Sequence, residues 1–178
     1  MLVALPIFYL SILTIFLICL SWIITKQLKT IFLLESQFKY FVDKRQNGIL
    51  GADEIFAFAR VCVAKKLFVN AIVESQAVLQ DKSYFTIANN NDIMSKLYNM
   101  LGFIYYEAGH SAFAKNFYLR AIDMNSNYIV ALNNLAKIYE DIKNFRKAED
   151  LYQQVLKINS SNETATRRMQ SISKLKNL

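Results

Sequence analysis

Turn-forming residues are scarce in this chain, whose 178 residues include one proline and four glycines. β-Sandwiches and β-barrels need many tight turns, so this composition argues against them and favours helices. Histidine is nearly absent too, because His110 is the only one and it falls in a turn expected between two helices. The sequence contains no Ser-His-acid set, glycine-rich phosphate loop or metal-ligand cluster. We therefore expect no cofactor and no enzymatic activity.

Cysteine is the next scarce residue. Cys19 and Cys62 lie in apolar contexts and belong to no CxxC pair, which indicates buried thiols in a reducing compartment. The net charge of +7 is basic, but the charges are scattered through helical patterns and no arginine-rich arm is present. We therefore expect no nucleic-acid partner.

Charge is missing altogether from residues 2–25, a run of 24 residues. As a helix that rises about 1.5 Å per residue, this run would be roughly 36 Å long, enough to cross a hydrocarbon core of about 30 Å. A cleaved signal peptide would need a charged beginning, a shorter apolar run and small residues before the cut, and these are lacking. The run predicts a retained transmembrane helix, so the protein is expected to be membrane-embedded.

The basic residues next to this span predict its orientation. No basic residue precedes it, whereas Lys26 and Lys29 follow it at once. The positive-inside rule then places the N-terminus outside and the rest of the chain in the cytoplasm or its organellar equivalent. Residues 26–51 are expected to form a helical linker that ends near Asn47-Gly48. Its apolar face would rest either on the bilayer surface or on the first folded element after it.

The decisive pattern is an internal repeat. Residues 95–128 and 129–162 align without a gap, so that each pair of equivalent residues lies 34 positions apart. The aligned pairs are Leu101-Gly102 with Leu135-Ala136, Tyr105 with Tyr139, Ala114 with Ala148, and Tyr118 with Tyr152. This length and this order of residues resemble the tetratricopeptide repeat, in which each repeat is two antiparallel helices. The small residues predict close helix crossings.

A weaker copy of the repeat occupies residues 52–85, where Lys66-Leu67 replaces the usual Gly-Asp of the turn between helices. An Asn-rich loop that ends in a helix N-cap is expected over 86–94, and a basic capping helix over 163–178. The predicted fold is thus all-α. It consists of an N-terminal transmembrane helix, an α-solenoid of three tetratricopeptide repeats and a C-terminal capping helix.

In such repeats the first helix of each pair lines a concave groove that binds peptides. Asparagine amides there can hydrogen-bond the main chain of an extended peptide, and aromatic rings can cover its side chains. The candidate groove residues are Phe56, Arg60, Asn99, Phe103, Tyr106, Asn133 and Lys137. Repeats that bind the acidic C-terminus of heat-shock chaperones share a clamp with three cations. Only Arg60 is a cation among the matching positions here, so that clamp is not expected.

The chain as a whole resembles a thylakoid protein family of cyanobacteria and algal plastids, hypothetical chloroplast reading frame thirty-seven. The resemblance rests on the span and on the stretches KKLFVNAI (65–72), NYIVALNNLAKIYE (127–140) and ETATRRMQSI (163–172). It implies a single-pass thylakoid membrane protein with its repeats on the stromal or cytoplasmic side. It also implies a role in photosystem I assembly, with photosystem I subunits or assembly intermediates as partners.

Two other functions fit the same layout. A protein-targeting receptor also joins one N-terminal span to such repeats, and it should capture many unfolded precursors through an apolar groove. An anchored scaffold for cytochrome maturation is the other alternative. An assembly factor, in contrast, should co-fractionate with one immature complex.

Overall fold

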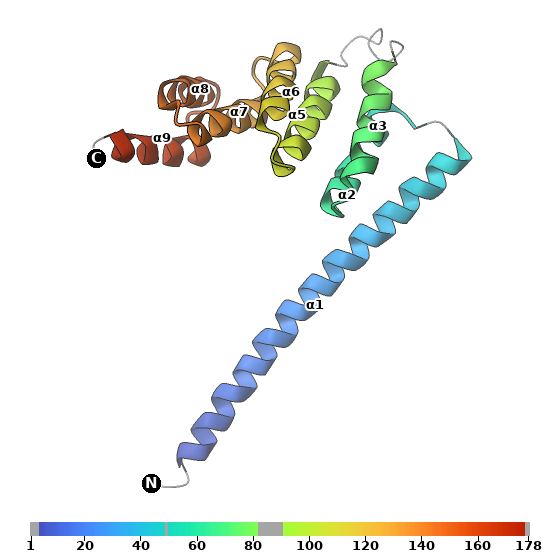
Figure 1. The fold of residues 1–178 in the computed structure, drawn as a ribbon. Helices are drawn as coiled ribbons and strands as arrows, with labels where there is room; N and C mark the ends of the chain where they lie inside the picture. Colours follow the sequence, from blue (N-terminus) through green and yellow to red (C-terminus); the bar gives the residue numbers. More distant parts are fainter. Residues whose placement is uncertain (1–3, 49, 82–90, 177–178) are drawn as a thin grey trace. The chain divides into compact units, whose positions relative to one another are not determined.

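The computed structural model describes residues 4–48, 50–81 and 91–176, and every regular element in these ranges is a helix. The chain divides into two compact units, Met1–Ile49 and Leu50–Leu178. The helices are α1 (Ala4–Asn47), α2 (Ala52–Ala64), α3 (Phe68–Gln80), α5 (Asn91–Glu107), α6 (Ser111–Met124), α7 (Ile129–Asp141), α8 (Phe145–Ile158) and α9 (Glu163–Lys176) (Figure 1). The predicted all-α class is confirmed.

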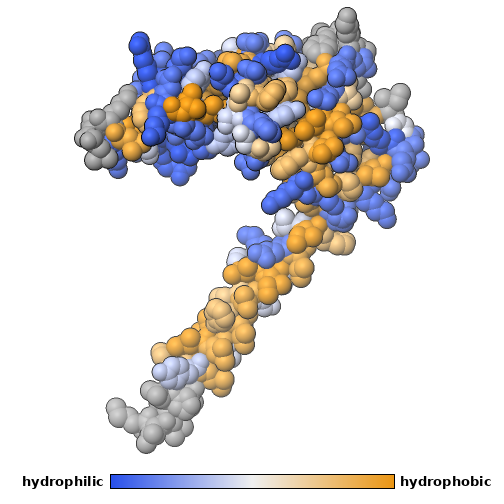
Figure 2. Space-filling view, in the orientation of Figure 1, coloured by the Kyte–Doolittle hydropathy of each residue, from blue (hydrophilic) through white to orange (hydrophobic). Residues whose placement is uncertain are grey.

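The first unit is α1, a single helix that continues from the apolar run into the expected linker and ends at Asn47. By length and composition its described part, Phe8–Asn47, could cross a membrane. Its apolar side chains are exposed along most of the helix (Figure 2). The hydroxyl groups of Ser11, Thr14 and Thr25 donate hydrogen bonds to carbonyl oxygens of the same helix at 2.7–2.9 Å. These polar groups are therefore satisfied without water, as a lipid environment requires.

The second unit is a stack of helix pairs. Helix α2 packs on α3, α5 on α6 and α7 on α8, while α9 packs against α8 (Figure 1). The core is made of small and aromatic residues that recur at the repeat spacing, and Ala114, Tyr118, Ala148 and Tyr152 are almost fully buried. Ala165 and Ile172 of α9 join the last core cluster, which closes the end of the stack. The predicted capping helix thus covers the third pair.

All three pairs share one turn geometry. Lys66, Gly109 and Lys143 hold the same place between paired helices, with φ values of 60°, 80° and 58°. In each turn the following backbone N–H bonds a carbonyl five residues earlier at 2.8 Å: Leu67 to Cys62, His110 to Tyr105 and Asn144 to Tyr139. This is the Schellman arrangement that ends many helices. The turn of the first pair therefore keeps its geometry without glycine, although a lysine in this conformation costs about 1–2 kcal/mol.

A close helix crossing lies at Gly102, as predicted. A Cβ atom added there would stand 2.5 Å from Cε1 and 2.6 Å from Cδ1 of Tyr118, closer than any real contact. Tyr118 is buried on α6, so its ring fills the space next to the glycine backbone. The equivalent residues of the next pair are Ala136 and Tyr152, both buried as well. Each of these two tyrosines belongs to the core, which matches the expectation from the sequence.

The loop predicted over 86–94 is wrong at its C-terminal end, because α5 begins at Asn91. Ile93 and Met94 are buried, so burying their side chains favours extending the helix by one turn. The Asp92 carboxylate lies in the first turn, where its negative charge interacts favourably with the helix dipole. It also pairs with the Lys96 ammonium one turn later. The rest of that loop, the last residues of the first repeat (82–85) and residues 177–178 lie outside the described residues.

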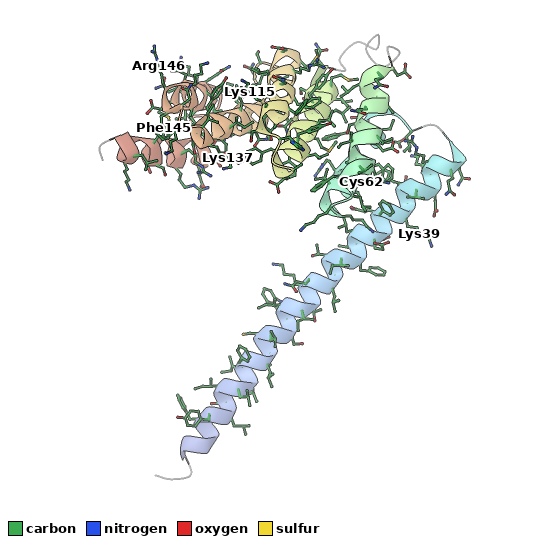
Figure 3. All side chains as sticks on the ribbon, in the orientation of Figure 1. Lys39, Cys62, Lys115, Lys137, Phe145 and Arg146 are labelled. Atoms are coloured by element: carbon green, nitrogen blue, oxygen red, sulfur yellow. The ribbon has the colours of Figure 1, made fainter. Side chains whose placement is uncertain are left out.

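The two cysteines differ. Cys62 is fully buried on α2 (Figure 3), as predicted. Burial, followed by the nearby Glu74 carboxylate, raises the pKa of its thiol from 9.0 to about 11, while Lys65 lowers it. The thiol is therefore protonated at neutral pH and a poor nucleophile. Cys19 is exposed on α1 and does not meet the expectation of burial.

Replacing Gly102 tests the close crossing. Gly102→Leu should lower the free energy of unfolding by about 1–3 kcal/mol, because the new side chain needs the space that the Tyr118 ring fills. Gly102→Ala should cost less, since the next pair accommodates Ala136 opposite Tyr152. His110→Ala, in an exposed turn, should change stability by less than about 0.5 kcal/mol. Denaturant melts that ranked His110→Ala as more damaging than Gly102→Leu would refute the crossing.

Candidate peptide-binding groove

The first helices of the pairs, α2, α5 and α7, together with the turn before α7, enclose an open cavity of about 600 Å³. We call it the Arg60 pocket. Its lining residues are Phe56, Arg60, Val63, Ala64, Lys96, Asn99, Met100, Phe103, Tyr128 and Val130. Four of the predicted groove residues, Phe56, Arg60, Asn99 and Phe103, therefore come together here. They do so because Phe56 and Arg60, like Asn99 and Phe103, are four residues apart and share one helix face.

A second, smaller cavity of about 140 Å³ lies among α5, α6 and α7. This Lys137 pocket is lined by Phe103, Tyr106, Glu107, Tyr118, Asn134 and Lys137. It adds two more predicted residues, Tyr106 and Lys137. Phe103 lines both pockets and is 38% exposed, so the two cavities adjoin at this residue of α5, and we call them together the groove.

The Arg60 pocket is apolar with a basic edge. The Cζ atom of the Arg60 guanidinium lies 5.9 Å from the centre of the Phe56 ring, within the range of a cation–π contact. Burial, followed by the Asp92 carboxylate, raises the pKa of the Tyr128 phenol, and the positive charge of Arg60 opposes this rise. Arg60 on α2 therefore acts electrostatically on the residue that caps the N-terminus of α7.

The polar groups of the Lys137 pocket satisfy one another. The Tyr106 hydroxyl donates a 2.6 Å hydrogen bond to Oδ2 of Asp141, and the Lys137 Nζ lies 3.4 Å from Oδ1 of the same carboxylate. Burial and then the bond to Asp141 raise the pKa of Tyr106. Hydrogen bonding to Tyr106, with support from Asp141, raises the pKa of Lys137, which projects from α7 (Figure 3). The Lys137 charge is thus balanced inside the groove.

The two candidate asparagines differ in their surroundings. Asn134 Nδ2 donates a 2.9 Å hydrogen bond to Oδ1 of Asn99, which ties α7 to α5. The Asn99 Nδ2 has no acceptor among the described residues, so its N–H groups can serve a ligand. Asn133 holds the same repeat position as Asn99 but lines neither pocket. Its Oδ1 is enclosed and has no donor within the described part of the chain.

Sequence reasoning missed several residues of the groove as ligand-facing positions. Met100 and Asn134, which are 34 positions apart in the aligned repeats, each line one of the two pockets. Tyr128 precedes α7 as its N-cap and so falls just outside the first-helix pattern. Tyr118 was assigned to the core, which is correct, but its ring also forms part of the floor of the Lys137 pocket. Counting the capping residue as part of each first helix would have found Tyr128.

Comparisons with known proteins agree with this architecture. Two family models, both described as tetratricopeptide repeat, match residues 129–162 and 95–128, the two ranges that align at an offset of 34. Such repeats indicate a protein-binding scaffold. The chain is similar to the ycf37 protein of Pyropia yezoensis, with 62% identity over 178 residues and all of both chains covered. It is also similar to ycf37 of Guillardia theta, with 29% identity over 70% of this chain and 67% of that one.

Solved structures share the fold at low identity. The first TPR of Spaghetti (RPAP3), bound to the HSP90 peptide SRMEEVD, superposes with a TM-score of 0.58 and 17% identity, covering 71% of this chain and 94% of that one. MamA superposes with a TM-score of 0.61 and 16% identity, covering 79% of this chain and 77% of that one. At this identity the likeness shows the fold alone.

The bond between Asn99 and Asn134 can be tested by a double-mutant cycle. Asn99→Ala and Asn134→Ala should each lower the free energy of unfolding, but together they should cost less than the sum of the two. A coupling of about 0.5–1.5 kcal/mol is expected for one such hydrogen bond. The matched control pairs Asn99→Ala with Asn116→Ala, on the exposed face of α6, and should be additive within about 0.5 kcal/mol. Additivity in both cycles would show that the amides are not coupled.

Proposed function

The chain belongs to the ycf37 family of tetratricopeptide-repeat proteins, and we propose that it is a membrane-anchored scaffold that binds photosystem I subunits or assembly intermediates through its groove. The observation that carries the binding role is that the Arg60 and Lys137 pockets adjoin at Phe103 on α5. Its apolar rings are open to solvent, and grooves of this kind bind extended or helical protein segments. The photosystem I role rests on the resemblance to a thylakoid family noted from the sequence.

Helix α1 serves as the membrane anchor in this proposal. Its described residues between Phe8 and Thr25 carry no charge, and their large apolar side chains are exposed. The Lys26 ammonium lies 5.4 Å from the centre of the Trp22 ring, so an aromatic and a basic residue stand together where the span would leave the bilayer. Lys26 and Lys29 favour a stromal or cytoplasmic position for the repeats. The membrane is then the thylakoid of a plastid or cyanobacterium.

Membrane extraction tests the anchor. Alkaline carbonate washing of thylakoids should leave the full-length protein in the pellet, because only disruption of the bilayer releases a transmembrane helix. A variant without residues 2–25 is the control and should appear in the supernatant. Protease added to the stromal face should digest the repeats of the intact protein. Release by carbonate would sink the anchor, and full protection from protease would reverse the orientation.

Truncating the groove rings tests the function. Phe56→Ala combined with Phe103→Ala removes two partly exposed rings of the Arg60 pocket, so binding should fall more than stability. Cells that carry this variant in place of the native copy should accumulate less photosystem I, while their amount of photosystem II changes little. Phe113→Ala is the matched control, since Phe113 is 60% exposed on α6 and lines neither pocket. It should leave the ratio of the photosystems normal.

The outcomes of this experiment separate the candidate functions. A normal photosystem ratio with a normal level of the double variant would eliminate the groove as the working surface. A general fall in many membrane proteins would instead favour a targeting receptor. A selective loss of cytochromes would favour a scaffold for cytochrome maturation.

A further inference from the structure

We propose that the Arg60 pocket selects partner segments in which a large apolar side chain stands next to a carboxylate. The carboxylate would belong to Asp, Glu or the C-terminus of the partner. This inference rests on the proposed function, because it specifies the chemistry of the segment that the groove binds.

The apolar part of the recognition comes from the pocket walls. Seven of the ten lining residues are apolar or aromatic: Phe56, Val63, Ala64, Met100, Phe103, Tyr128 and Val130. Val130 is 48% exposed and Phe103 is 38% exposed, so a ligand would remove apolar surface from water. The cavity volume of about 600 Å³ lies within the usual range of ligand pockets, about 300–1,000 Å³. The pocket can therefore admit a large apolar side chain with its neighbours.

The charge of the pocket is unbalanced. Its described lining includes two basic residues, Arg60 and Lys96, and no acidic one. Lys96 already pairs with Asp92 on the same helix. Arg60 has no carboxylate partner within the described part of the chain, and its contact is the face of the Phe56 ring. A guanidinium that lies over a ring keeps its N–H groups available for a carboxylate, which it can bind by two parallel hydrogen bonds. The Arg60 charge thus calls for an acidic ligand.

The neighbouring Lys137 pocket does not share this preference. Its cation is balanced by Asp141, and Glu107 adds a further negative charge to its wall. An acidic residue bound there would meet two carboxylates. Asn99 lies in the wall of the Arg60 pocket and retains a donor for a main-chain carbonyl of the ligand. The carboxylate of an extended segment is therefore expected at Arg60, with the rest of the segment running along α5.

Peptide selection on the full-length protein in lipid nanodiscs tests this inference. Random nine-residue peptides displayed on phage would be selected against the wild type, Arg60→Gln, Arg146→Gln and the double variant Phe56→Ala with Phe103→Ala. Arg146, exposed at the start of α8 (Figure 3), is the matched control. The wild type and Arg146→Gln should enrich peptides with Asp or Glu beside a large apolar residue.

Synthetic copies of the enriched peptides then give affinities. Replacing the acidic residue of the peptide by Gln should weaken binding to the wild type about tenfold, as expected for a charge-assisted hydrogen bond. The Arg60→Gln variant should bind the acidic peptide about tenfold more weakly than the wild type does, and its affinity for the Gln peptide should equal that of the wild type. Higher salt should weaken only the pairing of the acidic peptide with Arg60. Equal melting temperatures of wild type and Arg60→Gln would show that the variant is folded.

Failure of this inference differs from failure of the proposed function. Peptides that depend on Phe56 and Phe103 but show no acidic preference, or bind Arg60→Gln equally well, would overturn the inference alone. If the wild type enriched no peptide over the double variant, the groove would not be a peptide site, and both would fall.

Discussion

The close approach of the two helices in each pair is the constraint on which the repeat unit depends. At the crossing of α5 and α6, the Tyr118 ring occupies the space that any side chain at Gly102 would need. The corresponding residues of the other pairs are Ala136 with Tyr152 and Ala59 with Ser75. All four are almost completely buried. Packing at this density tolerates little change in side-chain volume, so it fixes the rotation of each first helix about its axis. This rotation also determines which residues lie on the opposite face of the helix.

The groove is a consequence of this rotation. With the small residues turned toward the second helices, Phe56, Arg60, Asn99 and Phe103 lie on the other face of α2 and α5. Two hydrogen bonds then tie successive first helices together, Tyr106 to Asp141 and Asn99 to Asn134, and both join residues 35 positions apart. Each bond therefore joins a residue of α5 to the residue of α7 that follows its repeat equivalent. The larger pocket lies between α2 and α5, the pair of first helices whose spacing in the sequence exceeds 34 by nine residues.

Much of this could be predicted from the sequence, because the repeat spacing and the small residues determine the helix pairs directly. The close crossing at Gly102 followed from repeat position, and six of the seven candidate residues chosen by repeat position line the two pockets. The start of α5 could not be found in this way, since burial of Ile93 and Met94 depends on tertiary contacts. Asn133 lines neither pocket, although it holds the same repeat position as Asn99, because α7 has different neighbours from α5. The geometry of the turn between α2 and α3 could not be predicted either, because Lys66 adopts a positive φ, a conformation in which glycine is usual.

We propose that the groove of this ycf37-family protein contacts photosystem I proteins at the thylakoid membrane. The most direct measurement is photo-crosslinking in intact thylakoids, with a photoreactive phenylalanine analogue at position 103 in one strain and at position 113 in another. Position 103 lines both pockets, whereas position 113 lies exposed on α6 outside them. Our account predicts adducts with photosystem I subunits from position 103 and not from position 113. Adducts from position 113 alone, or adducts from position 103 with a broad set of unrelated precursors, would contradict it.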